Sequence, residues 1–153
     1  MTRSTGTILL AALVLGGCHP SRGGRAVAGP ITVTHAVVPA PASTSEASAF
    51  LVVANAGPAP AVLRGASSPA ADSVRVHRFT GGLMEPADVV EVPSGGSQRF
   101  APGSFHLMLQ GLRHPLAIGD TVTVLLLFEP GGSVAVRFPV LNYTEAVSEL
   151  PLR

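Results

Sequence analysis

Short apolar segments, each followed by a chain breaker, run through most of this sequence and leave little room for helices. Val- and Leu-rich stretches, many of them alternating apolar with polar residues, are separated by AGPAP, SSPAAD, TGG, PSGG, APGS and EPGG. Alternation with a period of two is typical of strands, and Gly- and Pro-rich breakers are typical of turns. The expected strands are 31–38, 48–55, 61–66, 73–79, 88–92, 97–101, 105–111, 121–128 and 133–140. Such a series predicts an all-β chain, folded as an antiparallel β-sandwich of Greek-key type.

The N-terminal residues predict a secretory leader. Arg3 supplies a positive charge, and the apolar run 7–17 is too short to cross a hydrocarbon core of about 30 Å as a helix. The run ends in LGGC, and small residues before Cys18, the single cysteine of the chain, resemble a bacterial lipobox. This resemblance implies cleavage before Cys18 and lipidation of that residue. The alternative is an ordinary secretory signal followed by a chance cysteine.

The sequence therefore divides into four segments. We expect a lipoprotein signal peptide at 1–17, a lipid-anchored flexible tether at 18–30, the β-sandwich domain at 31–141 and a polar C-terminal tail at 142–153. The mature protein would lie outside the cytoplasm. Its lipid would hold it to the periplasmic side of the inner or the outer membrane.

Composition and absent motifs exclude several classes of function. A formal net charge of +1 gives no electrostatic attraction to nucleic acid. The chain has no Gly-rich loop ending in Gly-Lys, no nucleophile elbow and no paired-His zinc-protease motif, so we expect no enzyme. Once its cysteine is lipidated, the mature chain would lack the thiolate of a blue-copper site and the cysteines of a Cys-based zinc site.

Methionine and histidine are distributed in a distinctive way. The mature chain would contain two methionines, Met84 and Met108, and each lies close in sequence to a histidine. Alternation within two of the expected strands puts His77, His106 and Met108 on the faces turned away from the core, toward solvent. Met84 follows a tight TGGL turn, and a short hairpin there would bring it back near His77.

Two imidazoles and two thioethers form a ligand set suited to Cu(I). A thioether sulfur is soft and neutral, so it binds Cu(I) well and Mg, Ca or Zn poorly. Imidazole is a common copper ligand. The competing interpretation is that a single Met on a strand serves packing and that a single His is a surface or hydrogen-bonded residue. The closeness of both methionines to histidines strengthens the case for a metal site but leaves both interpretations open.

The spacing of these residues resembles the PCuAC family of periplasmic copper chaperones, over roughly residues 31–140. The family motif is His, a spacer, Met, twenty-one residues and His-x-Met. Here His77 precedes Met84, the twenty-one residues 85–105 follow, and His106 and Met108 complete the motif. The flanks ASSPAADSVRVH, VEVPSGGSQRFAPGSFHLMLQGL and PLAIGDTVTVLLLFEPGGSVAVRFPV fit as well. One departure is the spacer between His77 and Met84, six residues here and about ten in most of the family.

The resemblance implies a cupredoxin-like β-sandwich that holds one exposed Cu(I) between His77, Met84, His106 and Met108. It further implies a monomeric chaperone that delivers copper to the dinuclear copper site of cytochrome c oxidase, on subunit II, or to another copper-accepting protein. Two alternatives stay open. One is a metal-free immunoglobulin-like lipoprotein with a structural or adhesive role, and the other is a copper storage or tolerance protein with the same site.

Overall fold

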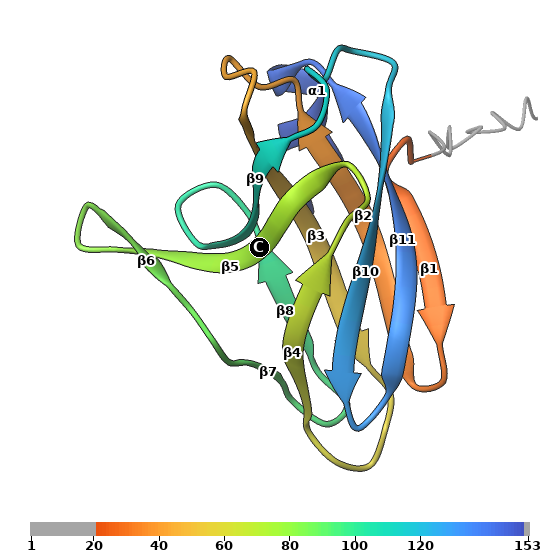
Figure 1. Ribbon diagram of the computed structural model, residues 1–153. Helices are drawn as coiled ribbons and strands as arrows, with labels where there is room; N and C mark the ends of the chain where they lie inside the picture. The colour runs from red at the N-terminus through yellow and green to blue at the C-terminus, as the bar shows by residue number, and fades with distance from the viewer. Residues whose placement is uncertain (1–20, 152–153) are drawn as a thin grey trace, which may run out of the picture.

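A computed structural model describes residues 21–151 (Figure 1). It contains eleven strands and one short helix. The elements are β1 (Gly24–Ala28), β2 (Ile31–Pro39), β3 (Glu46–Asn55), β4 (Ala61–Ser67), β5 (Ala71–Thr80), β6 (Leu83–Pro86), β7 (Val90–Val92), β8 (Ser97–Phe100), β9 (Phe105–Leu112), β10 (Thr121–Glu129), β11 (Gly132–Leu141) and α1 (Tyr143–Glu149). All nine strands expected from the sequence are present, as β2 to β5 and β7 to β11. The sequence did not predict β1, β6 or α1.

The strands close into a ring. Its order is β5, β9, β8, β3, β2, β11, β10 and β4, and pairing of Ala66 with Val74 joins β4 back to β5. Three further strands pair with members of this ring: β1 with β2, β6 with β5 and β7 with β4. The all-β class is therefore confirmed, and the strands form a closed eight-stranded barrel where we expected a cupredoxin-like antiparallel sandwich of Greek-key type. The sheet is not purely antiparallel. Two of its strand pairs are parallel, β11 with β2 and β8 with β9.

The barrel interior is filled by the inward residues of the alternating strands. In β10 every second residue from Val122 to Phe128 is buried, and the residues between them are exposed. The largest fully buried side chains include Phe100, Phe138 and Leu107. The alternation that predicted the strands also forms the core, as period-two patterns do when one sheet face is buried.

A second, smaller apolar cluster lies on the outside of the barrel. Val37, Phe50, Ala101, Ala146 and Leu150 form it. Two of these residues come from the C-terminal segment, which we expected to be a polar tail. Because the Asn142 side chain accepts a hydrogen bond of 2.9 Å from the backbone N–H of Glu145, it caps α1, and this cap starts a helix that covers the cluster.

The N-terminal expectation also needs correction. Residues 24–28, placed in a flexible tether, form β1 on the barrel. The predicted signal peptide and Cys18 lie outside the described residues. Among residues 21–151, no helix has the length and apolar character needed to cross a membrane.

Candidate metal centre

Two strands place both predicted histidines side by side. In the antiparallel pairing of β5 with β9, His77 lies directly opposite His106, and their ring centroids are 5.8 Å apart with the planes at 78°. Met108 is two residues further along β9, opposite Arg75. Residues opposite each other or two apart share a sheet face, so His77, His106 and Met108 lie on one face of the sheet, as alternation predicted.

A two-residue turn returns Met84 to the same face. Gly81 and Gly82 both have positive φ, 60° and 86°, as the two central residues of a type I′ turn require. The turn pairs Thr80 with Leu83, so Met84 lies opposite Phe79. Phe79 is two residues from His77, which makes Met84 a diagonal neighbour of His77. Such neighbours have backbones roughly 7–8 Å apart, within reach of a long side chain. The predicted hairpin is therefore present despite its short spacer.

The burial of this face differs from expectation. His106 and Met108 are only 5% and 9% exposed, where we expected the solvent side of a strand. The reason is Phe50, which belongs to the outer apolar cluster. Its ring contacts the His106 ring edge-on, with the two ring centroids 6.5 Å apart. Met84 is half-exposed, at 50%. The site is therefore sheltered on the β9 side and open on the β6 side.

One hydrogen bond of the His106 side chain indicates which ring nitrogen is available to a metal. Its Nδ1 lies 3.4 Å from the carbonyl oxygen of Ser104, and an N–H there donates to that oxygen. Nε2 then carries a lone pair, and it is buried without a hydrogen-bond partner. Burial lowers the pKa of His106, the Ser104 bond opposes this, and the nearby His77 lowers it further. A neutral imidazole with a free lone pair is the form that binds metals.

His77 also has a ring nitrogen without a hydrogen-bond partner. That nitrogen, Nδ1, is buried. Buried polar nitrogens are nearly always satisfied in folded proteins. Among the described residues four side-chain nitrogens are exceptions, on His35, His77, Arg99 and His106. Two of them belong to the facing rings of His77 and His106, and a shared metal ion would satisfy both. Within residues 21–151, no three His, Cys, Asp or Glu side chains are grouped to hold a metal ion. A metal between these two rings would draw its further ligands from the adjacent thioethers, which suits Cu(I).

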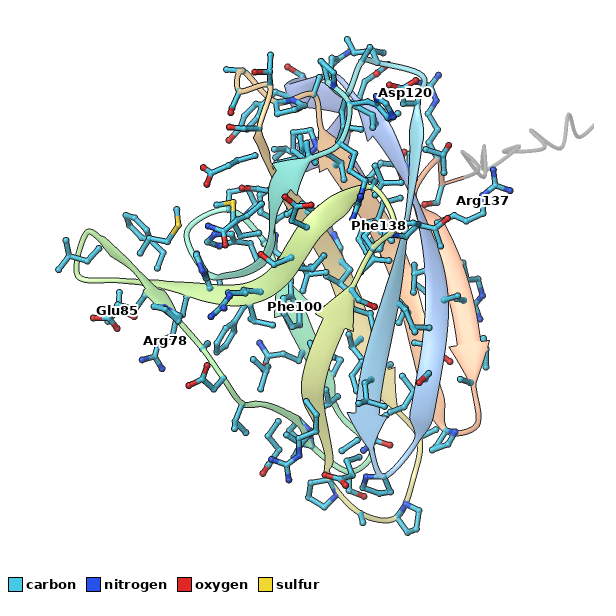
Figure 2. The ribbon with its side chains drawn as sticks, in the orientation of Figure 1. Arg78, Glu85, Phe100, Asp120, Arg137 and Phe138 are labelled. Carbon is cyan, nitrogen blue, oxygen red and sulfur yellow. The ribbon has the colours of Figure 1, made fainter. Side chains whose placement is uncertain are left out.

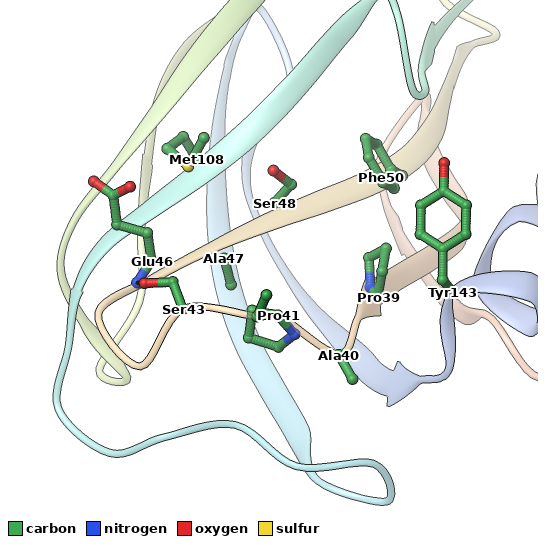
Figure 3. A pocket seen from close by; sticks show the side chains of 11 residues that line it. Pro39, Ala40, Pro41, Ser43, Glu46, Ala47, Ser48, Phe50, Met108 and Tyr143 are labelled. Carbon is green, nitrogen blue, oxygen red and sulfur yellow. Dashed lines mark hydrogen bonds between the residues drawn. The ribbon is translucent and has the colours of Figure 1, made fainter.

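A cavity adjoins Met108 on the side away from β5. It has a volume of about 380 Å³ and is lined by Met108, Phe50, Ser48, Glu46 and Tyr143, with the 39–43 loop as its far wall (Figure 3). Sequence reasoning missed both this cavity and Phe50. The available signal was Phe50 itself, because a large apolar residue out of phase with the core residues Ala49 and Leu51 indicates that something covers the outer face.

Residues 31–140 match the model of a family described as "Putative lipoprotein LpqE-like". The chain belongs to this LpqE-like family. A curated relative, "Putative lipoprotein Lxx21020" from Leifsonia xyli subsp. xyli, is 33% identical over 110 residues. The match covers 69% of this chain and 66% of the relative, so the chain spans just under two thirds of that LpqE-like protein's length.

Solved structures with the same fold are PCuAC domains. The copper-bound PCuAC domain from PmoF2 has a TM-score of 0.68 and 24% identity, and the match covers 77% of this chain and 97% of that domain. The Cu(I) form of DR1885 from Deinococcus radiodurans has a TM-score of 0.60 and 28% identity, with 71% and 76% covered. These likenesses show that the LpqE-like chain shares its fold with PCuAC domains, the family that its sequence motif resembles.

Proposed function

We propose that this protein is an extracytoplasmic Cu(I) chaperone in which His77, Met84, His106 and Met108 hold the ion. The observation that carries the proposal is the pair of facing imidazoles, each with a buried nitrogen that has no hydrogen-bond partner. Both thioethers lie on the same sheet face as the rings. Two structural neighbours, the copper-bound PCuAC domain from PmoF2 and the Cu(I) form of DR1885, support the choice of metal.

The proposed mechanism is ligand exchange. Burial lowers the pKa of His106, so its neutral form, with Nε2 free to bind, persists to a lower pH than in an exposed histidine. Met84 is the most exposed of the four side chains. It lies on β6, and β6 pairs with β5 alone. Met84 is therefore the ligand that a partner would displace first. Neutral thioethers leave more readily than thiolates, and the ion passes on without a covalent step in the protein.

We further propose that the protein is lipidated at Cys18 and acts on the outer side of a membrane. Its client is the dinuclear copper site of cytochrome c oxidase or another copper-accepting protein. The lipoprotein descriptions of the family and of the relative support the anchor. Storage or tolerance would use the same site, and oxidase activity in a deletion strain separates delivery from storage.

The test is Cu(I) titration against a competing chromophoric chelator. Wild type should retain one Cu(I) per chain, and X-ray absorption should show mixed nitrogen and sulfur neighbours. Met108→Leu, which keeps an apolar side chain at a buried position, and His106→Ala should both retain less. His114→Ala, at an exposed histidine outside the motif, is the matched control and should behave as wild type. Equal, negligible retention by all four proteins would favour the metal-free structural lipoprotein instead.

A further inference from the structure

The first described residues are fixed to the C-terminal helix. The Ser21 hydroxyl and the Gly23 backbone N–H donate to Oε2 of Glu149 at 2.8 and 3.3 Å, and the Arg22 N–H donates to Oε1 at 3.0 Å. Arg22 also forms a 2.7 Å ion pair with Glu145. Burial of the Glu149 carboxyl opposes its ionisation, but these three hydrogen bonds together lower its pKa. We call these five residues the N-terminal clamp.

From the clamp the chain enters β1, which lies far from the candidate metal centre. β1 pairs with β2 and contacts β11. Gly24 lies so close to the Arg137 carbonyl that a side chain there would collide with it. In the ring, β2 and β11 lie three or more strands away from β5 in both directions. β1 and β11 accordingly form one side of the barrel, and the β5–β6 hairpin projects from the other (Figure 1).

The side chains on the two sides differ in character. Arg25, Val27 and Arg137 are exposed on β1 and β11, and we call them the β1 surface. Val27 is 58% exposed. The ion pairs of the described residues include neither Arg25 nor Arg137. Figure 2 shows Arg137 directed outward on this side, whereas Arg78 and Glu85 of the hairpin, an ion pair, lie on the opposite side.

The length of chain before the clamp limits where this surface can be. From Cys18 to Ser21 there are three residue steps, which span at most about 11 Å. A lipid on Cys18 would therefore hold Ser21 of the clamp within that distance of the headgroups, and β1 begins three residues after Ser21. Unpaired arginines with an apolar neighbour are what an anionic phospholipid surface attracts.

We propose that the β1 surface rests on anionic phospholipid headgroups and that the candidate metal centre consequently faces away from the bilayer. The proposal rests on the lipid anchor of the proposed function and extends it to an orientation. A protein held in this way presents its copper on the aqueous side. Its partner must therefore carry its copper-binding group clear of the membrane, on a soluble protein or a protruding domain.

Energy transfer to labelled lipid tests the orientation in the full-length, lipidated protein. Because the chain has one cysteine, Cys18, an introduced cysteine is the single free thiol after acylation. Val27→Cys and Leu83→Cys are a matched pair, 58% and 67% exposed, on the β1 surface and on the hairpin tip. Each is labelled with a donor fluorophore and reconstituted into phosphatidylglycerol–phosphatidylcholine vesicles that carry acceptor-labelled headgroups.

Transfer should be several-fold stronger from position 27 than from position 83. Reversing the charges with Arg25→Glu and Arg137→Glu should reduce this difference. Equal transfer from both positions in acylated protein overturns the orientation and leaves the anchor standing. If mass spectrometry finds no acyl chains on Cys18, the anchor and the orientation both fail. The Cu(I) proposal is judged separately by the chelator titration.

Discussion

Replacing Phe50 by Ala should loosen the shelter around His106 and expose the ring. Phe50 is 6% exposed, packs in the outer apolar cluster and meets the His106 ring edge-on. Truncating a buried Phe to Ala typically costs about 3–5 kcal/mol, because transfer free energy and cavity contacts are lost together. The edge-to-face pair adds about 0.5–1.5 kcal/mol beyond burial. Because the site borders a cavity that water can enter, we expect the lower part of the range, about 3 kcal/mol.

The variant should also change the acid–base behaviour of His106. Burial is the largest cause that lowers the pKa of this imidazole. Removing the phenyl ring admits water to it, so its pKa should rise toward the ordinary value for histidine. The copper-binding neutral form would then be lost at a higher pH than in wild type.

Urea unfolding of the metal-free protein and NMR titration of the histidine ring protons measure the two effects. Phe79→Ala is the matched control, because Phe79 is also an aromatic residue on the metal face but is 45% exposed. It should cost less than about 1.5 kcal/mol and leave the pKa of His106 in place. A similar loss of stability in both variants, or an unchanged His106 pKa in Phe50→Ala, would refute the idea that Phe50 shelters the site.

Three further outcomes follow from contacts already described. Burial lowers the pKa of His106 in the folded protein below the ordinary histidine value of about 6.5. The unfolded chain therefore binds the proton more readily, and stability should fall as pH drops below about 6.5. His106→Gln should flatten this part of the urea-unfolding profile. Asn142→Ala removes the α1 cap and should cost about 1 kcal/mol in thermal or urea unfolding. Gly24→Ala would press a methyl group against the Arg137 carbonyl and should lower the free energy of unfolding by about 1–3 kcal/mol. The control, Ala28→Gly in the same strand, should lower it by less, about 0.5–1 kcal/mol.

The sequence predicted the strands well because their signal is local. Each expected strand carries its own alternation and its own breaker, so its identity does not depend on its partners. Closure of the barrel depends on β5 reaching both β9 and β4, where a single residue pair makes the second contact. No pattern within β5 distinguishes a strand at a sheet edge from one that closes a ring.

The placement of the four candidate residues on one sheet face was predictable from the sequence, but the surroundings of that face were not. Alternation places His106 and Met108 on one face, and the TGGL turn returns Met84 to it. The cover over the face that holds His106 and Met108 depends on α1. The polar residues of its segment led us to expect a tail and no helix. The Asn142 cap with Glu145 three residues later was a usable start signal. β1 is too short and too poor in large β-formers to predict by itself.

The two-glycine turn between β5 and β6 restricts how the length of this hairpin can vary in evolution. As long as the turn keeps two residues, one extra residue between His77 and Met84 moves the thioether to the opposite face of the hairpin. Two or four extra residues, divided evenly between the strands, return it to the original face. Insertions and deletions at this tip should therefore be tolerated in even steps and selected against in odd ones.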